Sequence, residues 1–87
     1  MNDVDWERVA KAFLHPLQVK ILEQAAGDPE WRFSPSELAS AYDVPLGIVA
    51  YHVKALYGQG LLRSAGKRAR PGVMQHYYRA SAQLLEG

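Results

Sequence analysis

The chain has 87 residues, 48% of them hydrophobic, which suffices for one small domain with one modest core. It contains no cysteine, and this excludes disulfides, thiolate metal sites and cysteine redox chemistry. The amino terminus lacks the basic region and apolar run of a signal peptide, and no apolar stretch is long enough to span a bilayer, so we expect a cytoplasmic protein.

The formal net charge of +1 hides a strong asymmetry along the chain. Residues 1–43 hold eight acidic side chains against four basic ones, whereas residues 44–87 hold six basic side chains against Glu86 alone. A segregated basic half is typical of a protein that binds a polyanion. A basic surface that is merely solvated is the alternative.

Hydrophobic periodicity predicts two helices in the first third of the chain. Residues 3–14 form the first helix and place Trp6, Val9 and Phe13 on one stripe. His15-Pro16 ends that helix, and Pro16 opens a second one that runs to about residue 26. The expected inward face of the second helix consists of Leu17, Ile21, Leu22 and Ala25. Residues 27–30 form a loop, and residues 31–33 form a short extended segment.

Residues 34–59 carry the pattern of two helices joined by a tight turn. Ser34-Pro35-Ser36-Glu37 is a capping box, in which the Ser34 side chain accepts from the Glu37 amide and Glu37 reaches back. The first helix stops before Val44-Pro45, because a residue that precedes proline is disfavoured in a helix. The second helix opens at Pro45 and has Val49, Val53 and Leu56 as its inward stripe. This is the helix-turn-helix arrangement, whose second helix is shaped to enter a DNA major groove.

Two strands are expected after the helices, at residues 61–65 and 73–79. Residues 66–72 between them are predicted to form a basic loop that carries Lys67, Arg68 and Arg70. Alternation along the second strand favours Met74 and Tyr78 as core residues. Residues 81–87 are long enough for barely two turns of helix.

The sequence therefore predicts a mainly α fold with a small β-hairpin (α+β), in the order α-α-(short β)-α-α-β-β. Residues 1–87 form a single winged helix-turn-helix domain. Its helix-turn-helix spans residues 34–59, and its wing spans residues 61–80.

Several motifs appear in the chain in a fixed order: H-P-L at the second helix, S-P-S-E-L-A, V-P-L-G-x-V-x-Y-H-V-K-x-L, G-L-L, and R-x-R-P-G-V-M-Q-H-Y-Y-R-A in the wing. Over these motifs, about three quarters of the chain resembles the winged-helix domain of ArsR-type bacterial transcriptional regulators, most of all the cysteine-free ArsR-like proteins. The resemblance implies a repressor-like regulator that binds duplex DNA, commonly as a dimer.

The chain departs from that family in its metal ligands and its carboxy terminus. It has no cysteine, and His15, His52 and His76 are isolated in the sequence, so we expect no metal and no cofactor. Residues 81–87 are too short for the carboxy-terminal helix through which many members dimerise. We therefore expect a homodimer joined through the first helix by Trp6, Val9 and Phe13, although this stripe could equally complete the core of a monomer.

The outward face of the second helix of the helix-turn-helix is the predicted reading surface. Gly47 permits a close approach to the phosphate backbone, and Ile48 and Ala50 can contact only a thymine methyl or fill space. Tyr51 and Lys54 are the candidates for direct contact with a base or a phosphate. The alternative for Tyr51 is a packed aromatic.

Further candidate contacts come from outside this helix. We expect Ser36 to touch phosphate, and Lys67, Arg68 and Arg70 to follow the backbone or enter the minor groove. A solvated hairpin tip is the alternative for these three bases. His52 lies beside the inward stripe, which favours a packed, hydrogen-bonded histidine over a pH switch or ligand. Arg63 and Arg79 are expected to extend the positive surface.

These features predict a duplex-DNA-binding transcriptional regulator, a repressor by resemblance. The alternative is a winged-helix module for protein–protein interaction that uses the apolar Ile48, Ala50 and Tyr57, against which the charge asymmetry argues. An enzyme is not expected, because the sequence has no paired-carboxylate motif in a predicted cleft, no nucleophile elbow, no phosphate-binding glycine loop and no metal cluster.

Overall fold

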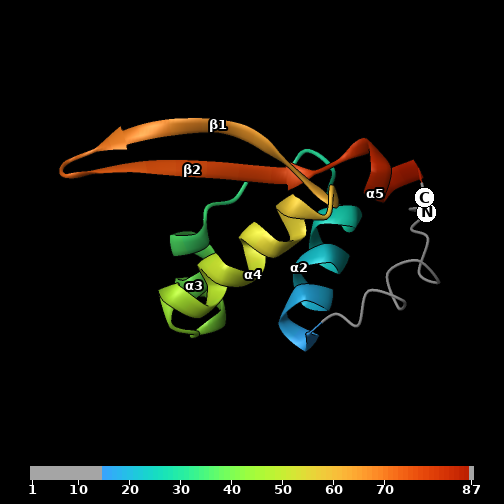
Figure 1. Cartoon of the computed structure of the whole chain (residues 1–87), viewed down its shortest axis with the longest axis horizontal. Helices are drawn as coiled ribbons and strands as arrows, with labels where there is room; N and C mark the ends of the chain where they lie inside the picture. The colour runs from blue at the N-terminus through green and yellow to red at the C-terminus, as the bar shows by residue number, and fades with distance from the viewer. Residues whose placement is uncertain (1–14, 87) are drawn as a thin grey trace.

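The computed structural model describes residues 15–86, which form a body of three helices with a long β-hairpin along one side (Figure 1). The predicted first helix, residues 3–14, lies outside the described residues, and so do Trp6, Val9 and Phe13. Three helices followed by an antiparallel hairpin is the α+β arrangement that the sequence predicts. The elements are α2 (Pro16–Gly27), α3 (Pro35–Tyr42), α4 (Leu46–Gly58), β1 (Leu62–Arg70), β2 (Val73–Ala80) and α5 (Ala82–Glu86).

The start of α2 is fixed by a capping box that uses a histidine. Nδ1 of His15 accepts from the Leu17 amide at 3.0 Å, and Oε1 of Gln18 accepts from the His15 amide at 3.2 Å. Pro16 occupies the first turn, where its missing N–H costs nothing. The predicted boundary is therefore confirmed.

The helix-turn-helix follows local sequence signals closely. The Ser34 side chain accepts from the Glu37 amide at 3.2 Å, and Glu37 Oε1 accepts from the Ser34 amide at 3.0 Å, so the predicted capping box is present. Asp43 adopts the left-handed conformation, with φ of 54°, and ends α3. Helix α4 begins at Leu46, one residue later than predicted, because Pro45 is the N-cap; its carbonyl accepts from the Ile48 and Val49 amides.

The core lies between α2, α3, α4 and the base of the hairpin. Val49, Val53 and Leu56 are fully buried on the inner face of α4, as the periodicity predicts. Burial of each such side chain contributes about 1.5–3 kcal/mol. They pack with fully or nearly fully buried side chains from the other elements: Ile21, Leu22, Ala25, Ala26, Phe33, Leu38, Leu61, Leu62, Ala80 and Leu84.

The expected short extended segment is present as a single bridge at Phe33. Its amide donates to the Tyr78 carbonyl at 3.0 Å, and the Tyr78 amide donates back at 2.8 Å. Phe33 thereby joins the base of the hairpin to the start of α3. Tyr78 is half-buried and packs against the core, as expected.

The hairpin itself differs from the prediction. Strand β1 continues to Arg70, and the connection is a two-residue turn, Pro71-Gly72, so the predicted loop of residues 66–72 is wrong. Gly66, with φ of 106°, lies within a register shift between Ser64 and Lys67. A glycine with positive φ accommodates such a bulge while the pairing continues beyond it. Gly72, with φ of 77°, supplies the left-handed residue of the tight turn.

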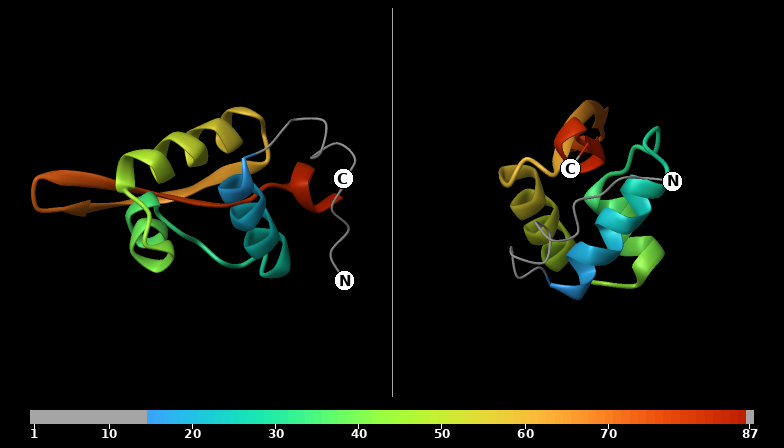
Figure 2. Two further views of the ribbon diagram at one scale, coloured as in Figure 1. Left: turned by 90° about the horizontal axis from the view of Figure 1, so that it is seen from below. Right: turned by 90° about the vertical axis from the view of Figure 1, so that its right-hand side faces the viewer.

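The outer half of the hairpin projects beyond the helices (Figure 2). Met74 is consequently 49% exposed, and its predicted place in the core is wrong. At the other end of the molecule, α5 anchors the end of β2 by burying Leu84, and Ser81 Oγ donates to the Gly60 carbonyl at 2.6 Å. Among residues 15–86, no helix has the length and apolar character to cross a bilayer.

Candidate nucleic-acid interface

The outer face of α4 is open to solvent. Tyr51 is 70% exposed and Ile48 is 48% exposed, and Gly47 and Lys54 are exposed beside them. The packed alternative for Tyr51 does not hold, since most of the side chain is exposed; its ring makes an angle of 77° with that of His52, with the centroids 5.2 Å apart. Ala50 is half-buried and faces the hairpin, so it lies at the margin of the reading surface.

Behind this face, α4 is held by His52. Its Nδ1 lies 3.0 Å from Nε2 of Gln18, and its ring stacks on that of His15 with centroids 4.5 Å apart. Burial lowers the pKa of His52, and the nearby charge of His15 lowers this pKa further. The prediction of a packed, hydrogen-bonded histidine is confirmed, and His15 and His52, which lie far apart in the sequence, are neighbours in the structure.

The three wing bases lie on strand β1. Lys67, Arg68 and Arg70 are exposed, and they extend outward along the hairpin instead of gathering on a loop. The Arg70 Nε–H donates to Oε1 of Gln75 at 2.8 Å, so one of the three is held by a side chain of β2.

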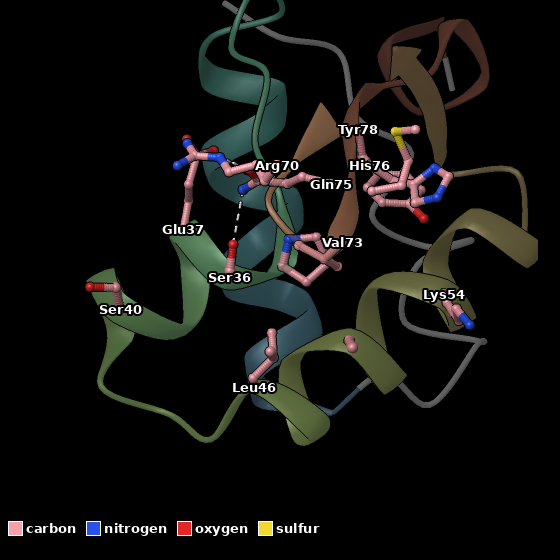
Figure 3. A pocket seen from close by; sticks show the side chains of 13 residues that line it. Ser36, Glu37, Ser40, Leu46, Lys54, Arg70, Val73, Gln75, His76 and Tyr78 are labelled. Carbon is pink, nitrogen blue, oxygen red and sulfur yellow. Dashed lines mark hydrogen bonds between the residues drawn. The ribbon is translucent and has the colours of Figure 1, made fainter. Parts of the chain in front are cut away.

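A groove of about 540 Å³ separates the hairpin from α3 and α4, and we call it the wing groove. Leu46 and Ala50 of α4 face Val73 and Met74 of the hairpin across it. Lys54 and Arg70 add bases to the walls, and Ser36 lies at the α3 end (Figure 3). The groove therefore combines an apolar floor with basic edges, and four of the predicted contact residues line it: Ser36, Ala50, Lys54 and Arg70.

Arg32 belongs to the acidic half of the chain in sequence, and its contact with the wing was not predicted. Its Nη1 donates to the Ala65 carbonyl at 3.2 Å, and its guanidinium lies 5.7 Å from the centre of the Tyr77 ring. Arg32 lines a second hollow of about 450 Å³ together with Lys67 and Arg68. Arg32 lies in an extended segment, two residues before the Ser34 cap. Such a segment could have suggested that Arg32 lies beside a strand of the hairpin.

Arg79 does not extend the positive surface as predicted. One Nη donates to the Pro29 carbonyl at 2.8 Å and lies 3.1 Å from Oε2 of Glu30. Its guanidinium is therefore paired with the loop before α3. Arg63 is exposed, and its role stays a prediction.

Gln75 is the other residue that the sequence analysis missed. Its Nε2 lies 2.6 Å from Ser34 Oγ and 2.9 Å from Ser36 Oγ, which joins β2 to the first turn of α3. Strand alternation placed Gln75 opposite Met74, but only the observed register brings it over α3. Within residues 15–86, no group of three or more histidine, aspartate or glutamate side chains is arranged to hold a metal ion.

A helix-turn-helix with an exposed second helix, followed by an antiparallel hairpin, defines the winged helix-turn-helix fold, and this chain has that fold. A solved structure described as "Possible transcriptional regulator from Methanosarcina mazei Go1" superposes on it with a TM-score of 0.73, at 16% identity, over 88% of this chain. The match spans 66% of that longer protein. No protein-family model matches the sequence, and no curated protein matches it either. The likeness shows the fold alone, and the ArsR-like subtype stays a prediction.

Proposed function

We propose that this protein is a transcriptional regulator that binds duplex DNA, and that it is a repressor of the ArsR-like, non-metal-sensing type. In this proposal α4 reads the major groove, and the wing contacts the backbone or the minor groove. The observation that carries the proposal is that Lys54 of α4 and Arg70 of the wing line one groove, on a surface that also exposes Tyr51.

The dimensions of duplex DNA support this arrangement. The major groove is about 12 Å wide and admits one helix, which α4 can supply with its exposed face. When α4 lies in the major groove and the hairpin reaches the next minor groove, the strand between the two grooves runs along the wing groove. Its phosphates then meet Lys54 and Arg70, while its deoxyriboses pack on Leu46 and Val73.

Sequence discrimination in this proposal depends on few side chains. Ile48 offers only apolar contact, which suits a thymine methyl, whereas Tyr51 and Lys54 carry hydrogen-bonding groups. A bidentate side-chain contact supplies about 1–3 kcal/mol of discrimination, and Ile48 cannot make one.

Selection of bound duplexes from a random pool tests this function. The wild type should enrich a defined site, and Ile48→Asn should enrich a different one, because an amide can pair with adenine. Ala41→Ser, an exposed substitution in α3 outside the wing groove, serves as the control and should leave the enriched site unchanged. Absence of any enrichment over the input pool would contradict sequence-specific reading.

A second candidate function is protein–protein interaction, as one observation favours it. Leu46 and Val73 are 52% and 62% exposed, and Ile48 and Tyr57 are exposed on the same helix as Leu46. Gel shifts at two salt concentrations separate the two functions, since binding to duplex DNA weakens steeply as salt rises. A protein that shifts no duplex at low salt would favour the interaction module.

The proposal includes a homodimer joined through the first helix by Trp6, Val9 and Phe13. Its support is the resemblance of the sequence to a family that commonly dimerises, together with the apolar stripe at helical spacing. A dimer would pair two half-sites about one helical turn apart.

A further inference from the structure

We propose that Gln75 is a positioning residue: it fixes the outer half of the wing to α3 and orients Ser36 and Arg70 toward the DNA backbone. This inference rests on the proposed function. Gln75 is uncharged and lies on β2, whereas the wing bases lie on β1. Its side chain reaches from β2 to the first turn of α3.

The outer half of the wing needs such an attachment. Along β1, Leu62 is the buried residue, and along β2 it is Ala80, so both strands are anchored at their base. The bridge between Phe33 and Tyr78 also lies in the inner half of the hairpin. Toward the turn, the side chains of β1 are exposed, and apolar packing alone does not fix the angle of the hairpin there.

Gln75 supplies the missing contacts through both ends of one amide. Its Nε2 donates to Ser34 Oγ at 2.6 Å and to Ser36 Oγ at 2.9 Å, and its Oε1 accepts from the Arg70 Nε–H at 2.8 Å. Ser34 is fully buried and already caps α3, so it is a rigid anchor. The amide thus joins β1, β2 and α3.

Ser36 and Arg70 each keep hydrogen-bond donors that this network does not use. Ser34 Oγ accepts from the Glu37 amide and from Gln75, so its own proton points to Ser36 Oγ, 3.2 Å away. Ser36 Oγ then accepts from Ser34 and from Gln75, which leaves the Ser36 hydroxyl proton without an acceptor among residues 15–86. Arg70 uses its Nε–H on Gln75, and its Nη groups have no hydrogen-bond acceptor in the part of the chain that the structure describes.

Both sets of free donors belong to residues that line the wing groove. A phosphate oxygen is the acceptor that hydroxyl and guanidinium donors share at DNA backbones. In the absence of the Gln75 amide, the Arg70 side chain would sample many rotamers, and binding DNA would have to order it. Gln75 therefore acts on DNA affinity through Arg70 and Ser36.

The test is the salt dependence of duplex binding by four proteins: wild type, Gln75→Met, Arg70→Ala and the double variant. Methionine keeps the length and bulk of glutamine but removes the donor and the acceptor. Each lost phosphate contact lowers the slope of log affinity against log salt by about 0.9. We expect Arg70→Ala and Gln75→Met each to lower the slope by about that amount, and the double variant to lower it no further than Arg70→Ala does.

Gln59→Met, at an exposed glutamine after α4, is the matched control and should bind as the wild type does. Circular dichroism checks that each variant is folded. If Gln75→Met is unfolded, Gln75→Asn replaces it, because asparagine keeps both groups but is too short to reach α3 and Arg70 together.

The outcomes separate this inference from the proposed function. If the wild type binds duplex DNA and Gln75→Met keeps its slope and affinity, the positioning role is wrong and the proposed function stands. If the decreases in salt slope add in the double variant, Gln75 does not act through Arg70, and the inference is again overturned. If the wild type binds no duplex, the proposed function and the inference both fail.

Discussion

The side-chain amide of Gln18 donates from Nε2 to Nδ1 of His52 across 3.0 Å and so ties the first turn of α2 to the centre of α4. Oε1 of the same amide accepts from the His15 backbone amide, so the amide cannot turn over without breaking the α2 cap. Nδ1 of His52 must therefore accept, which requires a neutral imidazole with its proton on Nε2. The helix that bears the predicted reading face is held from behind by an uncharged histidine.

Because of this arrangement, we expect stability to fall at mildly acidic pH. Burial, and then the charge of His15, lower the pKa of His52 below its usual 6.5 in the folded protein. The unfolded chain then binds a proton at a higher pH than the folded one, so stability is full above about pH 6.5 and is lost as pH falls through the folded pKa. Thermal melts between pH 8 and pH 5.5 should show the midpoint falling.

Two variants identify the group responsible for this pH dependence. His52→Leu should remove most of the slope in this window, whereas His76→Gln, at an exposed histidine of the wing, should keep it. An unchanged slope in His52→Leu would assign the pH dependence to another group.

Ser34→Ala should destabilise the protein through loss of a helix cap. The Ser34 side chain accepts from the Glu37 amide and is fully buried, and replacing such a cap by alanine costs about 1 kcal/mol. The lost acceptor for Gln75 adds to this cost. Urea unfolding measures the total loss of stability. The control is Ser40→Ala, at an exposed position within α3, which should change the free energy of unfolding by less than about 0.5 kcal/mol.

Phe33 and Met74 should differ sharply in their contributions to stability. Phe33 is 1% exposed and lies in the core, so Phe33→Ala should cost about 3–5 kcal/mol. Met74 is 49% exposed on the outer hairpin, so Met74→Ala should cost less than about 0.5 kcal/mol. Equal losses in chemical denaturation would place Met74 in the core, as its alternation in the sequence suggested.

The sequence predicted the elements that depend on neighbouring residues. The starts of α2 and α3 follow from proline and capping side chains within four residues, and the inner face of α4 follows from periodicity. The prediction ended the first strand too early, at residue 65, because a glycine such as Gly66 is typical of a loop boundary, whereas β1 continues to Arg70. Whether a glycine ends a strand or forms a bulge depends on the partner strand, which local sequence does not reveal.

In the candidate site, too, features set by neighbouring residues were predicted, and contacts between distant residues were not. Helical spacing predicted the exposure of Ile48 and Tyr51, because a helix face is set by residues three and four apart. Gln75 and Arg32 were missed because their contacts join residues far apart in the sequence: β2 to α3, and the segment before α3 to β1. Such contacts depend on strand register and on how the hairpin packs against the helices.

Assembly is testable in solution. The predicted dimer residues Trp6, Val9 and Phe13 share one stripe, so Trp6→Glu should shift the protein from dimer to monomer in sedimentation velocity, because a charge would be buried in the interface. Tyr57→Glu, at an exposed position of α4, is the control and should leave the dimer intact. A wild type that sediments as a monomer at high micromolar concentration would contradict the dimer.

The central claim is that α4 and the wing together bind the backbone of duplex DNA. Titration of one duplex at a series of salt concentrations, with wild type and with Lys67→Ala/Arg68→Ala/Arg70→Ala, tests it most directly. The wild type should bind more weakly as salt rises, and the triple variant should have a slope shallower by up to about 0.9 for each of the three bases. Identical slopes for the two proteins would contradict wing contact, and absence of wild-type binding at low salt would contradict the function itself.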